Sequence, residues 1–560
     1  MGQDSDNSGE RARGAWSTAP GSPTGGTYGR ASVPLNTVRP TSPAVVEGSV
    51  VGGPVRRDPA LSPAAGAAAG TSDEGRPVLV EGPSRSRTKW VVALSVVLVL
   101  GLAAAVVGLV RPGPVDGWLS AEPTSSPTPA PSTPDPSPTP VLVAAAGGGT
   151  ALTVEGVTKA IDPLVKSKAL GTKVHVAVVD VASGDVLYAR NADRMTTPAS
   201  ATKLLTAAAV LDARGPSYRL STRVVAGRSP GEIVLVGGGD PTLATGKNTL
   251  FPGAARLDLL ADQVKKSLGA VVPTRLLYDT SLFSGAETAK GWGSGDISSG
   301  QVSRVQALMV NAGRVKPIHH EFGGDPRSAD PANAAARAFA RMLGVSTSAV
   351  RKGKAPAASS SPSSAAAEII PGQQLGVVQS PPMVQLTDWM LGQSDNTAAE
   401  ALGRQVALAD GKPGTFDDAT EAIIARMDDF GLPADEANLY DASGLSRHNG
   451  ISPTLLTQLL SLAAAGQRPA LSGLFGGLPV AGWSGTMHQR FVQPKPNQAG
   501  QGVVRAKTGT LSGVNTMAGT LTTADGRLLV FAIMASGSGN AVTGRAALDT
   551  VAAKLVSCGC

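Results

Sequence analysis

The stretch Thr197-Pro-Ala-Ser-Ala-Thr-Lys-Leu-Leu205 decides how the rest of the chain is interpreted, because it combines a helix start with two reactive side chains. Pro198 favours the first position of a helix, and apolar residues follow at helical spacing over 204–211. Ser200 and Lys203 are three residues apart, so a helix brings the hydroxyl and the amine to one face. The stretch therefore offers a nucleophile with an adjacent base and needs no histidine.

A Ser-x-x-Lys match is weak by itself. In a Ser-rich chain of 560 residues, about one such match should occur by chance. The alternative interpretation is the ordinary start of a surface helix that happens to contain a serine and a lysine. The remaining sequence has to decide between the two.

Composition limits the classes of partner. Charged residues make up 16% of the chain, the formal net charge is +7 and aromatic residues make up 4%. Because Lys and Arg are not interleaved with aromatic residues, we expect no nucleic-acid partner. The chain is too long for one compact domain, so two or three are expected.

No metal or other cofactor is expected from the Cys and His residues. Cys558 and Cys560 are the only cysteines, and a zinc site would need more ligands. We expect a frayed tail there, with a local disulfide or a bond to a partner as alternatives. The five histidines lack His-x-x-x-His spacing and are His175, His319, His320, His448 and His488.

A membrane anchor is predicted near the N-terminus. Residues 1–89 are rich in Gly, Ser, Pro and Arg and cannot form a core, so we expect a disordered tail. Residues 90–110 are uncharged and largely apolar, and about 20 such residues cross a bilayer as a helix. A buried core helix and a cleaved signal peptide are disfavoured alternatives, the latter because the preceding region is too long.

The charges beside this span predict its orientation. Arg85, Arg87 and Lys89 precede it, and Arg111 follows. The positive-inside rule then places the N-terminus in the cytoplasm and everything after the span outside a single-pass cell-membrane anchor. Residues 111–150 contain a Pro/Ser/Thr-rich linker, which extends at about 3.1 Å per residue and would hold the following domain away from the membrane.

Alternating strands and helices are predicted from Leu152 onward. A Gly-x-Ser-x-Gly match at 227–231 lies between two strands, so it is interpreted as a turn rather than as a hydrolase elbow. The Ser/Ala-rich residues 346–367 are expected to form a flexible loop. The predicted strands include 174–180, 186–190, 307–310, 503–507, 514–522 and 528–534. The predicted helices are 254–268, 331–343, 383–390, 397–407, 417–430, 453–465 and 542–556.

Two further motifs follow the Ser200 stretch in order. Ser394-Asp-Asn396 lies between two predicted helices, and Lys507-Thr-Gly509 lies on a predicted strand. Alone, the first would suit a helix cap and the second a strand end with a bulge. Together with Ser-x-x-Lys they form a catalytic trio of penicillin-binding proteins and serine β-lactamases.

On these residues the chain resembles the D-alanyl-D-alanine carboxypeptidase/endopeptidase family, the class C low-molecular-mass penicillin-binding proteins. The likeness covers about 152–556, and the gap of about 190 residues between Lys203 and Ser394 exceeds that of a β-lactamase. In this family such a gap holds inserted domains. Accessory stretches that strengthen the likeness are Gly237-Gly-Gly-Asp-Pro-Thr-Leu243, Ser380-Pro-Pro382, Asp441-Ala-Ser-Gly-Leu-Ser446 and Leu478-Pro-Val-Ala-Gly482.

The resemblance implies an α+β fold. A penicillin-binding (DD-peptidase/β-lactamase-like) catalytic domain, with a central antiparallel sheet flanked by helices, would comprise residues 151–222 and 371–560. A smaller inserted domain would comprise residues 223–370.

The resemblance also implies the chemistry. Ser200 would attack the carbonyl of the penultimate D-Ala and form an acyl-enzyme. Lys203 would be the base if burial and a nearby cation, for which Lys507 is the candidate, lower its pKa. Ser394 would relay a proton to the leaving amine, and Asn396 would hold Lys203 and the substrate amide.

Substrate binding is assigned to Lys507-Thr-Gly-Thr510. The hydroxyls of Thr508 and Thr510 would bind the terminal carboxylate, and Gly509 lies between them. The backbone N–H groups of Ser200 and Thr510 would form the oxyanion hole. The implied partners are peptidoglycan stem peptides and, as covalent inhibitors, β-lactams.

Alternatives remain open at this stage. They are a β-lactamase or esterase of the same fold, and a non-catalytic cell-wall-binding protein. Whether the carboxypeptidase or the endopeptidase reaction dominates is also open, because that depends on the shape of the cleft.

Overall fold

The computed structural model describes residues 152–321, 323–357 and 369–560. The predicted tail (1–89), span (90–110) and linker (111–150) lie outside the described residues, as do residues 358–367 of the predicted Ser/Ala-rich loop. Within the described part, no helix is both long and apolar enough to cross a bilayer.

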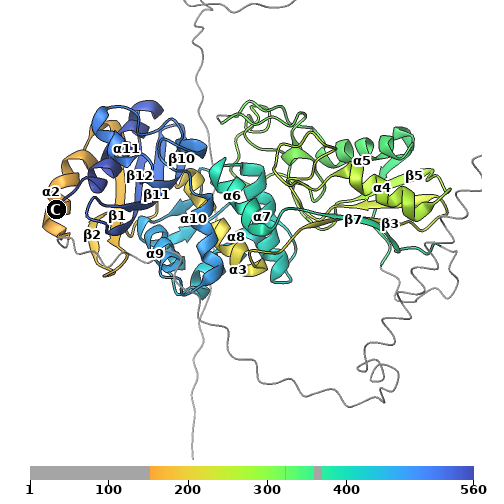
Figure 1. The fold of residues 1–560 in the computed structure, drawn as a ribbon, viewed down its shortest axis with the longest axis horizontal. Helices are drawn as coiled ribbons and strands as arrows, with labels where there is room; N and C mark the ends of the chain where they lie inside the picture. Colours follow the sequence, from red (N-terminus) through yellow and green to blue (C-terminus); the bar gives the residue numbers. More distant parts are fainter. Residues whose placement is uncertain (1–151, 322, 358–368) are drawn as a thin grey trace, which may run out of the picture. The chain divides into compact units, whose positions relative to one another are not determined.

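A five-stranded sheet underlies Ser200. Its strand order is β10-β11-β12-β1-β2, and every neighbouring pair is antiparallel, as predicted. Strand β1 pairs with β12, so the beginning and the end of the described chain meet in one sheet (Figure 1). The bounds are β1 Lys173–Asp180, β2 Val186–Arg190, β10 Arg505–Leu511, β11 Val514–Thr522 and β12 Leu528–Ser536.

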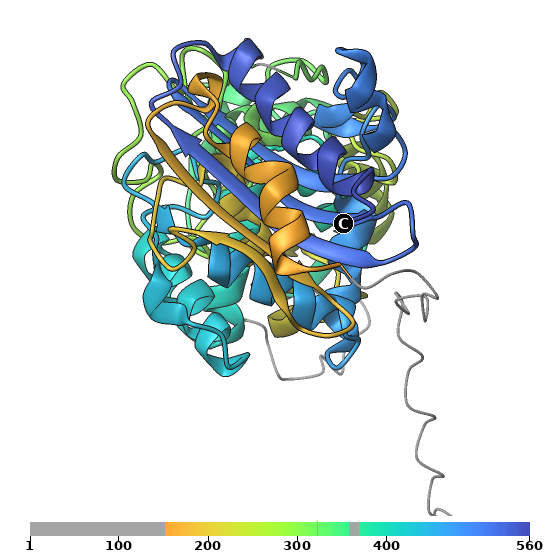
Figure 2. The same cartoon turned by 90° about the vertical axis from the view of Figure 1, so that its left-hand side faces the viewer.

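Strand alternation gives this sheet two apolar faces. Leu529, Phe531 and Ile533 of β12 pack in the core shared with helices α2 (Val154–Val165) and α11 (Ala541–Val556). Figure 2 looks onto that face, with both helices lying across the strands. The intervening residues Val530 and Ala532 belong to the core on the opposite face, as the two-residue period of a strand requires.

The opposite face is covered by a group of helices that contains the Ser200 region. Helix α3 is buried on nearly every side, and the small residues at 207–209 let its neighbours approach closely. The bounds are α3 Lys203–Arg214, α6 Met383–Gly392, α7 Asn396–Ala409, α8 Phe416–Asp429, α9 Pro453–Ala464 and α10 Gly473–Gly477.

A second five-stranded sheet is built from residues 221–379. Its order is β6-β5-β4-β3-β7, and helices α4 (Leu257–Leu268) and α5 (Pro331–Met342) pack in its core. As predicted, the Asp330 side chain caps α5 by accepting from the Asn333 backbone N–H. The domain limits at 222/223 and 370/371 stay a prediction. The strands are β3 Ser221–Ala226, β4 Glu232–Val236, β5 Arg275–Asp279, β6 Val350–Lys352 and β7 Gln374–Gln379.

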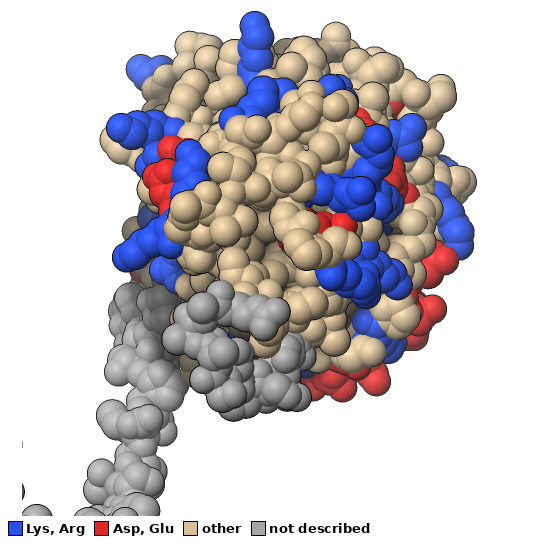
Figure 3. All heavy atoms as spheres, turned by 90° about the vertical axis from the view of Figure 1, so that its right-hand side faces the viewer, with Lys and Arg blue, Asp and Glu red and all other residues tan. Residues whose placement is uncertain are grey.

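The right-hand side of Figure 1, where this second sheet lies, faces the viewer in Figure 3. Its Lys and Arg side chains form several separate groups, and Asp and Glu side chains lie among them. This face therefore presents mixed charge rather than one continuous basic surface.

The strand predicted at 307–310 is wrong. Leu308 packs in the core of the second sheet, whereas Ala307 and Met309 pack in a small cluster with Phe283. The apolar residues thus point alternately to two cores, as in a strand, but the Ala307 carbonyl accepts from the Gly239 N–H in a loop contact (2.8 Å). Because these residues are buried on two sides, their sequence has the alternation of a strand, although they pair with no strand among the described residues.

Two other expectations fail at places where composition misled. Within the predicted flexible loop, residues 350–352 form β6, which pairs in parallel with β5 and buries Val350. The expected frayed tail is wrong as well: Cys558 and Cys560 form a local disulfide, and the Cys560 carbonyl accepts from the Thr153 N–H (3.0 Å). The long-range contacts of these short segments decide their structure.

Candidate active site

Ser200 lies in a short 3₁₀ turn, η2 (Ala199–Thr202), and not within the α-helix that we predicted to begin at Pro198. Helix α3 begins only at Lys203, whose side chain is fully buried. The Thr516 hydroxyl on β11 donates to the Pro198 carbonyl (2.8 Å) and attaches the turn to the first sheet. The nucleophile is therefore placed where the sheet meets α3.

The Lys203 amine has three neighbours that together suit an uncharged base. Its Nζ lies 3.0 Å from Ser200 Oγ, 2.6 Å from Asn396 Oδ1 and 2.7 Å from the Ser443 carbonyl oxygen. The last two oxygens only accept hydrogen bonds, so they take both N–H groups of a neutral amine. The nitrogen lone pair is then directed at the Ser200 hydroxyl.

Burial favours the neutral form of both lysines. It lowers the pKa of Lys203 to about 8, against the opposing charges of Asp441, Glu400 and Asp395. Burial, and then the charge of Lys203, lowers the pKa of Lys507 well below its usual value. The expected influence of a neighbouring cation therefore acts on Lys507, whereas burial alone accounts for the lowering at Lys203.

The loop 441–446, which the sequence marked only as an accessory stretch of the family likeness, contacts the site through the Ser443 carbonyl. The Glu400 carboxylate on α7 accepts from the backbone N–H groups of Ala442 and Ser443, both at 3.0 Å. The Asp441 carboxylate accepts from the N–H groups of Gly444 (2.8 Å) and Ser446 (2.6 Å). These bonds hold the Ser443 carbonyl toward Lys203.

Ser394 and Lys507 form a second polar pair in the same cleft. Lys507 Nζ donates to Ser394 Oγ (2.9 Å) and to the Thr508 carbonyl (2.7 Å). Ser394 adopts a left-handed backbone with φ of 56°, which is costly for a residue other than glycine. The structure thus brings Ser200, Lys203, Ser394, Asn396 and Lys507 together from three distant parts of the chain.

Gly509 lets β10 pass close to the nucleophile. A Cβ at this position would lie 2.8 Å from the Ser200 backbone N and 2.3 Å from Thr516 Oγ1. The strand therefore approaches η2 more closely than any side chain would allow. This approach sets the distance between the Ser200 N–H and β10.

Gly509→Ala is expected to displace that turn. Overpacking of this kind typically lowers the free energy of unfolding by about 1–3 kcal/mol. Here the added methyl group should displace the Ser200 backbone N–H. We expect a lower melting temperature and an acylation rate reduced by about tenfold or more, in line with the loss of one oxyanion donor. Thermal unfolding and β-lactam acylation kinetics measure both effects. Gly539→Ala, after β12, controls for loss of a glycine, because a Cβ there meets nothing within 4 Å and the backbone is not left-handed. Equal acylation rates for Gly509→Ala and the wild type would contradict the account.

Thr508 and Thr510, which are predicted to bind substrate, have partners that the sequence did not indicate. Thr508 Oγ1 lies 2.8 Å from Thr486 Oγ1, and Arg545 Nε donates to Thr510 Oγ1 (3.2 Å). Ser200, Ser394, Asn396, Thr508 and Thr510 all line one cavity of about 930 Å³, which Arg545 also lines. A cavity of this size accommodates a small molecule or a short peptide segment.

The segment between the first two motifs also reaches this cavity. Gly291, Asp296, Gln301 and Glu321 line it, and the Gln301 carbonyl accepts from Asn396 Nδ2 (3.1 Å). No motif signals these contacts, because they join residues about 100 positions apart. Within the described residues, no cluster of His, Cys, Asp and Glu could hold a metal ion.

Comparisons with known proteins agree with this geometry. The family model of the D-Ala-D-Ala carboxypeptidase 3 (S13) family matches residues 157–355 and 326–555. A carboxypeptidase of Mycobacterium tuberculosis is 39% identical over 410 residues, which cover 72% of this chain and 84% of that protein. Carboxypeptidase DacB of Mycolicibacterium smegmatis is 37% identical over 387 residues, covering 68% and 80%.

A solved structure shows the same fold. Penicillin-binding protein 4 of Haemophilus influenzae aligns with a TM-score of 0.56 at 22% identity, over 72% of this chain and 98% of that one. As the three motifs predicted, the chain belongs to the D-Ala-D-Ala carboxypeptidase 3 (S13) family, the class C low-molecular-mass penicillin-binding proteins, and is a serine-type D-Ala-D-Ala carboxypeptidase.

Proposed function

We propose that the protein removes the terminal D-alanine of peptidoglycan stem peptides through an acyl-enzyme on Ser200, and that the same cleft accepts cross-linked stem peptides. The observation that carries this proposal is the environment of Lys203. Its amine faces the Ser200 hydroxyl at 3.0 Å, while two acceptor oxygens at 2.6 and 2.7 Å occupy its N–H groups. This arrangement suits proton transfer from the hydroxyl to the amine.

Acylation follows from this geometry. Ser200 Oγ bonds to the carbonyl carbon of the penultimate D-Ala as its proton passes to Lys203 Nζ. The N–H groups of Ser200 and Thr510 stabilise the oxyanion. As the C–N bond breaks, the departing amine takes the Ser394 proton, and the proton that Lys203 took from Ser200 replaces it on Ser394. Lys507 Nζ, 2.9 Å from Ser394 Oγ, orients this hydroxyl by donating a hydrogen bond to it.

Deacylation uses the same groups. Water adds its oxygen to the ester carbonyl, and the bond between the acyl carbon and Ser200 Oγ breaks. One proton of the water passes to Ser200, the other is released to solvent, and the shortened peptide leaves as a carboxylate. The hydroxyls of Thr508 and Thr510, with the charge of Arg545 beside Thr510, suit binding of the terminal carboxylate of the substrate.

The activity is tested with a synthetic stem peptide that ends in D-Ala-D-Ala. We expect release of one D-alanine per peptide and none from the matched peptide that ends in D-Ala-L-Ala. A cross-linked dimer of stem peptides tests the endopeptidase reaction in the same assay. Cleavage of neither D-Ala-D-Ala substrate would contradict the proposal.

We further propose that residues 90–110 anchor the protein in the cell membrane, with the N-terminus cytoplasmic and the catalytic part outside. The apolar run and the basic residues Arg85, Arg87 and Lys89 before it support this orientation. The full chain is expected in the membrane fraction after cell lysis, and a chain that begins at residue 152 in the soluble fraction. Full-length protein in the soluble fraction would contradict the anchor.

A further inference from the structure

Arg314, in the segment between the first two motifs, lies between two buried carboxylates. Its Nε donates to Asp325 Oδ2 (2.8 Å), and its Nη2 lies 2.9 Å from Asp395 Oδ2. The side chains of Arg314, Asp325 and Asp395 are 2%, 3% and 1% exposed. Asp395 is the middle residue of the Ser394-Asp-Asn396 motif, so this ion pair ends inside the active site.

We propose that Arg314 is a positioning residue, which acts through Asp395 to hold the Ser394 hydroxyl and the Asn396 amide in place for proton transfer to the leaving amine. This inference rests on the proposed function. It assigns to the inserted segment a part in catalysis rather than only a wall of the cleft.

The charges of the cluster are balanced, which is the condition for burying them. Arg314 and Arg327 face Asp325 and Asp395, and each charge has an opposite partner. Burial raises the pKa of Asp395, but the charges of Arg314 and Arg327 more than offset it and hold the pKa below its usual value. Removing one member leaves an uncompensated buried charge, which is strongly unfavourable.

Asp395 connects Arg314 to its two neighbours in the sequence, Ser394 and Asn396. Its Oδ1 accepts from the Ala398 N–H (2.9 Å) and caps α7, so one carboxylate holds the start of the helix and the ion pair together. Ser394 precedes it in a left-handed conformation, which persists only when the surroundings enforce it. A shift of the Asp395 carboxylate therefore releases the Ser394 backbone.

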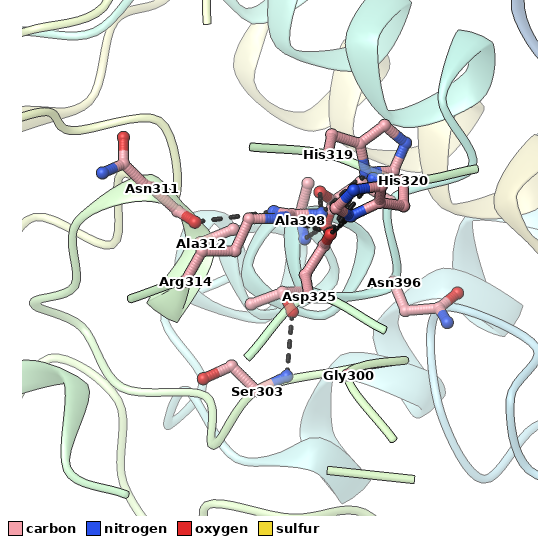
Figure 4. Close-up of polar contacts among 12 residues, drawn as sticks. Gly300, Ser303, Asn311, Ala312, Arg314, His319, His320, Asp325, Asn396 and Ala398 are labelled. Atoms are coloured by element: carbon pink, nitrogen blue, oxygen red, sulfur yellow. Dashed lines mark hydrogen bonds and ion pairs between the residues drawn. The ribbon is translucent and has the colours of Figure 1, made fainter. Parts of the chain in front are cut away.

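The same cluster reaches Asn396 by a second route. Figure 4 shows Arg314 and Asp325 of the cluster together with His319 and His320, and Asn396 nearby. Arg327 donates from Nη2 and Nε to the Gly300 carbonyl (2.8 and 3.2 Å). Gly300 packs so closely on Asp325 that a Cβ would lie 2.5 Å from its backbone N. The next carbonyl, of Gln301, accepts from Asn396 Nδ2 (3.1 Å). Ser394 and Asn396, the first and last residues of the motif, are thus both connected to one group of buried charges.

A lysine cannot replace Arg314 in this role. The rigid, planar guanidinium contacts Asp325 through Nε and Asp395 through Nη2, whereas an ammonium is a point charge on a flexible chain. Arg314→Lys keeps the positive charge and removes the planar group that contacts both carboxylates at once. It therefore tests positioning with the least disturbance to the buried charge balance.

The experiment compares two substrates with the full chain. One is the D-Ala-D-Ala peptide, whose leaving amine needs a proton from Ser394. The other is its thioester analogue, whose thiolate leaving group needs none, because thiols have a pKa of about 8.5. General acid catalysis contributes about 10²–10⁴-fold, so a misplaced Ser394 in Arg314→Lys should lower kcat/KM for the peptide by about tenfold or more. The value for the thioester should fall by less than about threefold.

The ratio of the two kcat/KM values does not depend on how much enzyme is correctly folded. Arg527→Lys, which changes an ion pair with Asp180 at the β11–β12 turn (2.6 Å), is the matched control and should leave the ratio unchanged. If Arg314→Lys yields no folded protein, Asp325→Asn is measured in its place and should lower the ratio in the same direction. A parallel fall for both substrates, or an unchanged ratio, overturns the inference, whereas a wild-type protein inactive on both substrates overturns the proposed function instead.

Discussion

Replacing Ser200 by Ala is expected to abolish D-alanine release from stem peptides, with kcat reduced by on the order of 10⁴-fold or more. The hydroxyl lies 3.0 Å from the Lys203 amine, and Ser200 lines the cavity in which the substrate would bind. Peptide release by chromatography measures the change. The non-catalytic wall-binding alternative predicts no difference, because there would be no activity to lose.

The fold should survive this substitution. Ser200 is partly exposed, and Lys203 keeps its bonds to Asn396 and Ser443. The melting temperature of Ser200→Ala is therefore expected within a few degrees of the wild type. Loss of activity with an intact fold identifies the nucleophile, and activity within tenfold of the wild type would show that the hydroxyl is not the attacking group.

Lys203→Met should have the second largest effect. Methionine has a similar length, but it cannot accept the Ser200 proton, and loss of a general base typically costs about 10²–10⁴-fold. Because it also leaves two buried acceptors without their donor, we expect a lower melting temperature as well. Lys554→Met, at an exposed position of α11, controls for the loss of a charge.

The wild-type enzyme should show the titration of this base. Only the neutral amine accepts a proton, so kcat/KM should rise with pH until the lysine is deprotonated. With the pKa lowered to about 8, about a quarter of the enzyme is active at pH 7.5, against about one molecule in a thousand at the usual value. A pH profile that falls between pH 6 and 8 would contradict the assignment.

The sequence could indicate which side chains gather in the candidate site because each motif is short and local. Ser200 and Lys203 share one turn, and the residues of Ser394-Asp-Asn396 and Lys507-Thr-Gly509 are adjacent, so their order alone indicated the trio. The family resemblance implied the antiparallel sheet, and the structure confirms it. What remained unpredicted depends on long-range contacts.

The Ser443 carbonyl is one such contact. It binds Lys203 across 240 positions of sequence, and a backbone carbonyl leaves no signature in the residue type. Arg314 resembled any other arginine until the fold placed it against Asp395. The residues at 307–310 showed the converse error, because burial between two cores imitated the period of a strand.

Mass spectrometry of the protein after exposure to penicillin tests the central claim most directly. A β-lactam carries a reactive amide that the same nucleophile should open, which leaves a stable ester. We predict one covalent adduct per chain, found after digestion on the peptide that contains Ser200 and absent from Ser200→Ala. An unlabelled protein, or an adduct on any other peptide, would contradict the account.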